Sequence, residues 1–308
     1  MRRAVLILIA LSGCDELFGL DPLEVPAPGW LEGYRYRKAI ALTPSASLTD
    51  FTVSITANDP DLAAHASADG ADFIFTERDG TTYLASELVS YARGTLDAWV
   101  RVPQLVPPST SIYLYYGGPP STLVAPVWSD DFAGVWHFGH VLGEADSTSH
   151  EHDLGAPPAQ LPAPTDGIAG GARRYDGVDD SLCVGQVGDP SLEVGAASFS
   201  YSVWVRAGAG VDDFDMPMWK GGGNAGQRGY ELELGTGGWT FNVADDVRVV
   251  QGYFGLAIVG RWVNVVVVVD RSNDMAVGYI DGGAAAQVSV SALGALSDAA
   301  NLLCIGPD

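Results

Sequence analysis

The clearest pattern of apolar and polar positions lies between Arg261 and Gly282. A run of valines, Val265–Val269, is followed by the turn-forming residues Ser272–Asp274, and an apolar run resumes at Met275–Ile280. β-Branched side chains favour strands, whereas Asn and Asp favour turns. We therefore predict a β-hairpin that is buried at the centre of a sheet packed between layers and is closed by an Asp-Gly turn.

Shorter runs of β-branched and aromatic residues recur along the rest of the chain, separated by turn-forming residues. Residues 51–55 and 199–206 alternate apolar and polar positions with a period of two, as half-buried strands do. Within residues 30–118, only Pro60–Ala68 is typical of a helix. The 38 glycines and 18 prolines leave little room for long helices. The pattern predicts an all-β protein built from sandwiches.

The length of 308 residues favours two domains. We predict an all-β domain, a small β-sandwich, at residues 30–118, a proline-containing linker at 119–127 and a second domain at 128–308. In the second domain we expect a first strand at Val135–Phe138. An irregular, surface-exposed stretch is expected at 139–171, because no apolar period appears there.

The beginning of the chain has the layout of a secretory signal. Basic residues precede an apolar run, Ala4–Leu11, that is too short to span a bilayer. Leu11-Ser12-Gly13-Cys14 follows and resembles the lipobox of bacterial lipoproteins. The resemblance implies a signal peptide at residues 1–14, acylation of Cys14, and export to the bacterial cell envelope. An ordinary signal peptide with an incidental cysteine is the alternative.

Residues 15–29 contain three prolines and no hydrophobic period, which is typical of an extended tether. The formal net charge of −22 at pH 7 disfavours nucleic-acid binding, because phosphate is bound by basic patches. We therefore expect no nucleic-acid partner, and contact with a membrane through the lipid anchor only. The carboxylates are scattered and are interpreted as a solvated surface.

Four motifs of the first domain occur in a family order: Tyr36–Lys38, Ala68–Phe75, Ala98–Pro103 and Ile112–Gly117. Together they resemble an uncharacterised bacterial extracytoplasmic domain of unknown function, which is often fused to laminin G-like modules. The resemblance transfers no catalytic residue. Aromatic residues are common in half-buried strands, so we interpret Trp99, Tyr113 and Tyr115 as core residues. A sugar-stacking face is the alternative.

Six motifs of the second domain also occur in order: Trp136–Phe138, Tyr175–Asp180, Ser198–Val205, Trp262–Val267, Gly278–Gly282 and Leu303–Gly306. Together they resemble the laminin G-like branch of the concanavalin A-like lectin/glucanase superfamily. The resemblance implies a jelly-roll sandwich of two antiparallel sheets. The family usually continues with one more strand carrying Ile-Asp-Glu, so we expect the last strand to be missing after Asp308.

Asp176, Asp179 and Asp180 form a carboxylate-rich turn. Calcium prefers oxygen ligands and calcium sites recur in the family that this domain resembles, so these residues are the candidate calcium ligands. Turn formation beside Gly177 is the alternative, and no cofactor is expected to be required. The following histidines lack zinc-like spacing and are interpreted as surface residues: His137, His140, His150 and His152.

Glu231 and Glu233 share one face of a predicted strand, because strand side chains repeat every two residues. Hydrolases of the superfamily carry three carboxylates on such a face, in the pattern Glu-x-Asp-x-Glu. Here the third position is Gly235 and the middle position is Glu. The full set of catalytic roles cannot be assembled. We expect solvent-facing glutamates, no catalytic residues and no enzymatic activity.

Cys183 and Cys304 are the cysteines that remain after removal of the signal peptide, and both lie in strand-like runs. In an oxidising compartment they are a candidate disulfide. Two buried free thiols are the alternative, because the sequence does not give the Cα separation that a bridge requires.

These features predict a lipid-anchored binding or adhesion protein of the cell envelope. Its C-terminal sandwich is expected to recognise a carbohydrate or a surface protein. The lipobox, the tether and a lectin-like resemblance without a catalytic set favour this interpretation. An envelope glycoside hydrolase and a purely structural surface protein are the alternatives.

Overall fold

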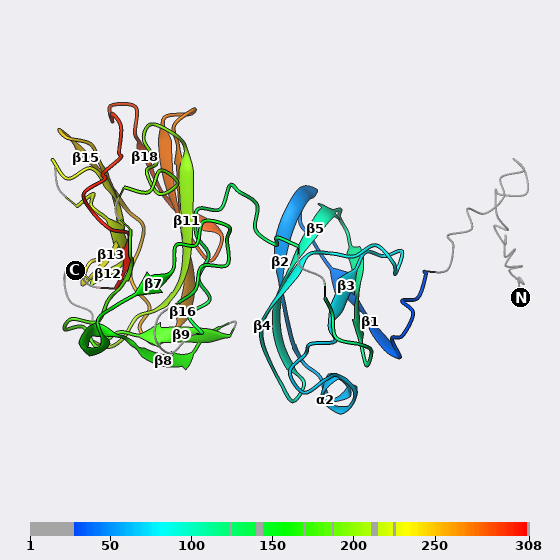
Figure 1. Ribbon diagram of the computed structural model, residues 1–308. Helices are drawn as coiled ribbons and strands as arrows, with labels where there is room; N and C mark the ends of the chain where they lie inside the picture. The colour runs from blue at the N-terminus through cyan, green and yellow to red at the C-terminus, as the bar shows by residue number, and fades with distance from the viewer. Residues whose placement is uncertain are drawn as a thin grey trace, which may run out of the picture.

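The computed structural model describes residues 28–122, 125–139, 144–168, 170–186, 188–210, 215–223 and 226–306. The predicted signal peptide, Cys14 and most of the tether lie outside this range. Two β-rich units stand side by side and are joined by an extended segment (Figure 1). Among the described residues, no helix is both long and apolar enough to cross a membrane.

The first unit is a sandwich of two three-stranded sheets. One sheet has the order β1-β6-β3, with β1 (Tyr36–Leu42), β6 (Thr110–Tyr116) and β3 (Ile74–Thr76). The other has the order β2-β5-β4, with β2 (Leu48–Asn58), β5 (Thr95–Leu105) and β4 (Ser86–Ala92). Apolar residues that alternate along β5 and β6, such as Val100 and Leu114, fill the core between the sheets.

Helix α2 (Pro60–His65) is shorter than the predicted Pro60–Ala68. Its N-cap is Asp59, whose carboxylate accepts a 2.8 Å hydrogen bond from Asp61 N. Beyond its C-terminus, the buried Asp72 carboxylate accepts bonds from Ser67 N at 3.0 Å and Ser67 Oγ at 2.7 Å. These bonds hold the chain in a turn and so prevent the helix from continuing.

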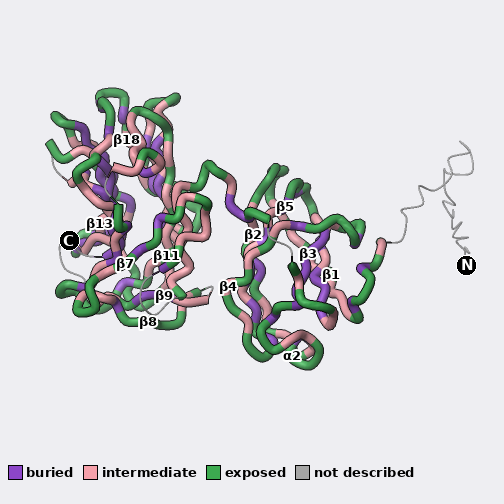
Figure 2. The backbone as a smooth tube through the Cα atoms, viewed as in Figure 1, coloured by how far each residue is buried: buried purple, intermediate pink, exposed green. Residues whose placement is uncertain are grey.

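The second unit contains two larger antiparallel sheets among its described residues, as predicted for a jelly-roll sandwich. The first sheet has the order β15-β14-β13-β12-β19-β10-β7: β15 (Val249–Tyr253), β14 (Gly238–Ala244), β13 (Gly229–Gly235), β12 (Asp215–Lys220), β19 (Cys304–Ile305), β10 (Leu182–Val184) and β7 (Leu154–Gly155). The second has the order β11-β16-β17-β18: β11 (Phe199–Arg206), β16 (Trp262–Asp270), β17 (Met275–Ile280) and β18 (Gly283–Ser289). Buried residues lie inside each unit, and exposed residues follow the loops (Figure 2).

The β16–β17 hairpin forms at the predicted place, but it is not packed between two layers. Val265, Val267 and Val269 are fully buried in the core, whereas Val266 and Val268 are half-buried on the opposite face. The outer face of an antiparallel sandwich sheet faces solvent, so only alternate valines enter the core. The prediction that the whole valine run is buried is therefore wrong.

The predicted strand at Val135–Phe138 is also wrong. Only one isolated bridge, between Trp136 and Asp146, forms there, and Phe138 has a φ of 55°, which ends the extended run. The described part of 139–171 contains short elements only, which agrees with the predicted irregular stretch: β7, the 3₁₀ helix η1 (Pro158–Gln160), β8 (Ala163–Asp166) and the start of β9 (Gly171–Arg174).

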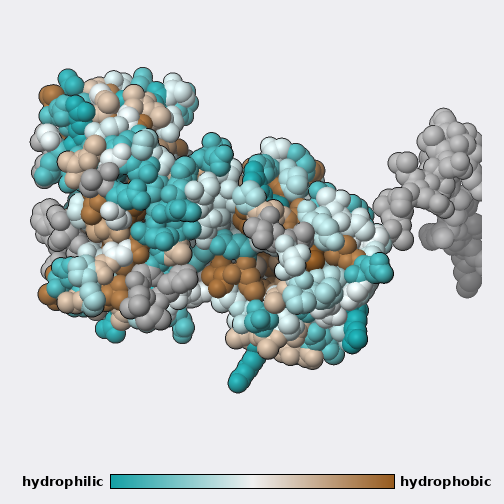
Figure 3. All heavy atoms as spheres, viewed as in Figure 1, coloured by the Kyte–Doolittle hydropathy of each residue, from teal (hydrophilic) through white to brown (hydrophobic). Residues whose placement is uncertain are grey.

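Side chains of the first unit contact the segment that opens the second. Trp99, on the outer face of β5, lies 5.3 Å from the Trp128 ring and 6.1 Å from the His137 ring. Trp99 is therefore not a core residue of its own sheet, and His137 is not a surface histidine. On the face shown in Figure 3, hydrophobic residues gather where the two units meet.

Two further sequence predictions about single side chains have different outcomes. Tyr115 is fully buried, as predicted for a core aromatic residue. Tyr113 is partly buried against the same hydrophobic cluster, and the Arg37 guanidinium lies 4.3 Å from its ring centroid. His152 was predicted at the surface but is buried, with Nδ1 2.6 Å from Ala133 O and Nε2 3.2 Å from Asp189 Oδ2. Its polar partners offset the cost of burying the imidazole. His140 lies outside the described residues.

Candidate functional site

One row of side chains crosses the outer face of the seven-stranded sheet. Directly paired residues of antiparallel strands point to the same face of a sheet. The observed register places these residues in the row, in order: Gln251, Asn242, Glu231, Trp219, Cys304 and Cys183. Their neighbours along the strands, such as Leu232 and Phe241, point the other way and are fully buried in the core. The alternation of the strands therefore gathers this row on one face.

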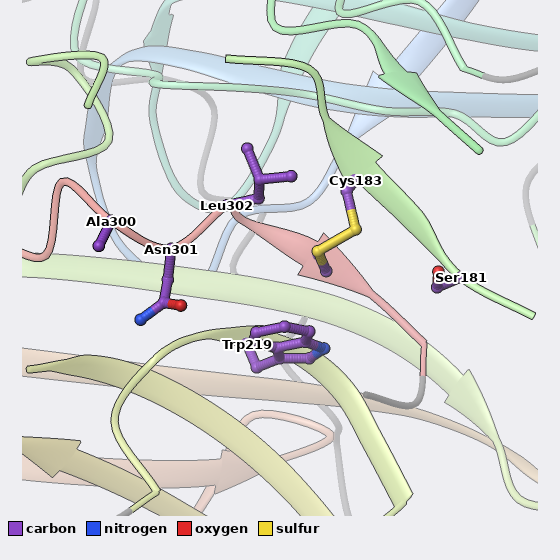
Figure 4. A pocket seen from close by; sticks show the side chains of 7 residues that line it. Ser181, Cys183, Trp219, Ala300, Asn301 and Leu302 are labelled. Carbon is purple, nitrogen blue, oxygen red and sulfur yellow. A yellow bond between two sulfur atoms is a disulfide. The ribbon is translucent and has the colours of Figure 1, made fainter. Parts of the chain in front are cut away.

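Trp219 lines an open depression of about 380 Å³ on this face. Its ring lies below the disulfide, with Asn301 on one side and Ser181 on the other (Figure 4). The indole Nε1 donates a 3.1 Å hydrogen bond to Gly306 O, which fixes the ring's orientation. The depression thus combines an aromatic ring with an amide and a hydroxyl group, which donate and accept hydrogen bonds.

A buried cation supports the loop that carries Asn301. Lys220 follows Trp219 on β12 and points to the opposite face, where its Nζ donates to Asp298 O and Asn301 O, each at 2.7 Å. The same Nζ lies 2.9 Å from Glu193 Oε1. A buried ammonium needs such partners because desolvation disfavours its charge. The 298–301 loop is therefore held against the sheet beside Trp219.

Cys183 and Cys304 form a disulfide in the structure. They are direct partners in the β10–β19 register, with a Cα–Cα distance of 4.1 Å, although 121 positions separate them in the sequence. The structure thus supplies the separation that the sequence left open. The bridge joins β19, close to the end of the described chain, to β10 and forms one wall of the depression.

Glu231 and Glu233 share a face as predicted, but Glu231 is not solvent-facing. Glu231 is only 6% exposed and Asn242 is 3% exposed. The Asn242 amide donates to Glu231 Oε1 and to Glu233 Oε2, the latter at 3.3 Å, so one amide ties both carboxylates. A Cβ at Gly223 would lie 2.8 Å from Glu231 Oε2, so the glycine-rich loop passes directly over this carboxylate.

Asp176, Asp179 and Asp180 come together in the turn between β9 and β10, with one carboxylate oxygen of each within 4.8 Å of the others. Asp176 Oδ1 accepts from Val178 N, and Asp180 Oδ2 accepts from Asp176 N, both at 2.9 Å. Carboxylate oxygens suit calcium, which takes six to eight oxygen ligands. The triplet fits part of such a shell, and further oxygens would have to complete it. Calcium binding remains a prediction.

Residues 176–308 match a family model described as the concanavalin A-like lectin/glucanases superfamily. The two antiparallel sheets of this region agree with that match. These residues form a concanavalin A-like, laminin G-like sandwich domain. The matched span includes the carboxylate-rich turn, Trp219 and the disulfide. A comparison with curated protein sequences gives no match.

Solved structures with a related arrangement include three whose similarity to this chain is low. The binding domain of Paraclostridial Mosquitocidal Protein 1 has 13% sequence identity and a TM-score of 0.43. The match covers 55% of this chain and only 44% of the length of the mosquitocidal protein structure. The Ruminococcus gnavus IT-sialidase CBM40 bound to α2,6-sialyllactose has 15% sequence identity and a TM-score of 0.30, and the match covers 39% of this chain and 70% of the CBM40 chain. Mouse laminin α1 domains LG4-5 have 11% sequence identity and a TM-score of 0.33, and the match covers 92% of this chain and 86% of the laminin chain.

Proposed function

We propose that this protein is a lipid-anchored binding protein of the cell envelope whose lectin-like domain binds carbohydrate in the depression beside Trp219. The observation that carries the proposal is a half-buried tryptophan ring that lines an open depression of this domain. An aromatic face packs against the apolar C–H face of a sugar. Asn301 and Ser181 flank the ring and offer donors and acceptors to sugar hydroxyls.

The support for a lipid anchor comes from the sequence. Leu11-Ser12-Gly13-Cys14 resembles a lipobox, and the tether to residue 29 separates Cys14 from the first folded strand. Anchoring would hold the lectin-like domain at the envelope, where glycans and surface proteins are its available ligands. Adhesion to such a ligand is the activity that this arrangement serves best.

The test is a glycan array probed with the full chain, with and without calcium. We expect binding to a defined set of glycans and at least a roughly tenfold loss in Trp219→Ala, as for removal of a central aromatic contact. Trp30→Ala is the matched control, since Trp30 is an exposed tryptophan of the first unit. Absence of binding to any glycan, or equal loss in both variants, contradicts the proposed site.

A glycoside hydrolase is the second candidate function, because Glu231 and Glu233 lie on one strand face. The burial of Glu231 and its bond to Asn242 favour a structural carboxylate over an acid or base that meets substrate. We expect no glycan turnover by the purified protein. Turnover that is lost in Glu231→Gln would replace the binding proposal with hydrolysis.

A further inference from the structure

The loop between β15 and β16 exposes aliphatic side chains. Leu256 is 70% exposed, Ile258 is 49% exposed and Val259 is 55% exposed. From Gly255 to Gly260 the loop contains no polar side chain. Surface loops usually carry polar residues, and a contiguous exposed apolar patch marks an interaction site. We call Leu256–Val259 the aliphatic loop.

The backbone contacts of the aliphatic loop keep these side chains exposed. Gly255 O accepts from Trp239 N at 2.8 Å, and Gly260 N donates to Ala207 O at 2.9 Å, so both ends of the loop are tied to the sandwich. The glycine turn between β13 and β14 passes against the loop: a Cβ at Gly238 would lie 2.9 Å from Leu256 Cα. A glycine has no side chain with which to cover Leu256.

Aromatic and basic residues surround the base of the aliphatic loop. Tyr253 ends β15 on one outer face of the sandwich, and Trp204 lies near the end of β11 on the other, and both are exposed. Arg206 Nε donates to Gly260 O at 3.0 Å, and Arg261 follows the loop directly and pairs with Asp281. Two arginines thus adjoin the loop in a chain with 16 basic and 38 acidic residues.

We propose that the aliphatic loop inserts into a lipid surface. Aliphatic side chains cannot hydrogen-bond a glycan but fit the acyl layer, where their burial is favourable. Tyr253 and Trp204 then lie at headgroup level, where amphipathic rings are favoured. Arg206, whose only side-chain partner among the described residues is the Gly260 carbonyl, then complements the lipid phosphates. This contact is independent of the depression beside Trp219 and of the lipid at Cys14.

The first test places an environment-sensitive fluorophore on Leu256→Cys in the full chain, with Cys14→Ser to leave one reactive thiol. The control carries the label at Val247→Cys. Val247 is also 70% exposed but lies in the β14–β15 turn, at the opposite end of the sandwich. Phosphatidylcholine vesicles should shift the emission of the Leu256 label to the blue and leave the Val247 label unchanged. No shift, or equal shifts, overturns the proposal.

The second test measures flotation of the unlabelled Cys14→Ser protein with phosphatidylcholine vesicles. Ile258→Asp should lower the bound fraction about tenfold, because a buried aliphatic group is replaced by a charge. Val247→Asp should bind as the parent does, and circular dichroism should show both variants folded.

A second copy of the chain is the other possible occupant of the loop, and the labelled protein tests it. A blue shift of the Leu256 label that appears without vesicles, as protein concentration rises, overturns the proposal by showing that a second copy covers the loop.

Discussion

The indole Nε1 of Trp128 donates a 2.8 Å hydrogen bond to the carboxylate of Glu87, and this bond joins the two units. Glu87 also accepts from Ser147 Oγ at 2.5 Å and lies 3.2 Å from His137 Nε2. One carboxylate on the outer face of the first unit is therefore shared by three side chains of the segment that opens the second. Beside it, Trp99 and Trp128 add a ring contact.

The Glu87 contact makes stability depend on pH. Burial raises the pKa of Glu87, but the hydrogen bonds from His137, Ser147 and Trp128 outweigh it and hold the pKa below its usual value. A carboxyl whose pKa is lower in the folded state stabilises the fold above its unfolded pKa of about 4.3. That contribution is lost as pH falls through the folded pKa.

We therefore expect Glu87→Gln to lower the free energy of unfolding by about 1–2 kcal/mol near neutral pH. The difference from the parent protein should shrink as denaturation is repeated towards pH 3. Glu32→Gln, at an exposed position of the same unit, is the control and should change the free energy by less than about 0.5 kcal/mol. A difference that does not vary with pH contradicts the role of Glu87.

Adjacent valines of β16 should differ in their importance. Val267 is fully buried, whereas Val268 is half-buried on the outer face. Val267→Ala leaves a cavity in the core and should cost about 2 kcal/mol in denaturant unfolding, whereas Val268→Ala should cost less than about 1 kcal/mol. Equal losses at the two positions would mean that the outer face is covered as well.

Loss of the disulfide should destabilise the second unit. The bridge closes a loop of 121 residues, which is worth about 4–5 kcal/mol in the chain-entropy model. Urea unfolding of the double variant Cys183→Ser with Cys304→Ser should show a loss of this order. The parent protein unfolded in the presence of a reducing agent should have the same urea midpoint as the double variant. If the midpoints of the double variant and of the reduced parent both equal that of the oxidised parent, the bridge has no structural role.

The effect of calcium on stability tests whether the carboxylate-rich turn binds the ion. If Asp176, Asp179 and Asp180 hold the ion, calcium at ten times its dissociation constant should stabilise the fold by about 1.4 kcal/mol. Thermal unfolding with calcium and with a chelator measures this shift. Asp179→Asn should abolish it, and Asp166→Asn, an exposed position on β8, should not. No shift at millimolar calcium would leave these residues as turn formers.

The sequence alone determined the two-sandwich architecture, the sharing of one face by Glu231 and Glu233, and the strands apart from the one predicted at Val135–Phe138. These properties follow from the period of two in the side chains and from turn-forming residues, which act over a few positions of the chain. Even so, the valine run was interpreted as fully buried, because a period cannot be read from consecutive apolar residues.

Only the tertiary structure decided which distant residues meet. The depression joins Ser181, Trp219 and Asn301, and the register that pairs Cys183 with Cys304 crosses 121 positions. Trp99 is not in the core of its own sheet and His137 is not at the surface, because the two side chains pack against each other where the units meet. The exposure of Leu256 depends on a glycine turn in a different hairpin. Burial and contact are properties of the packed chain, and a local pattern does not contain them.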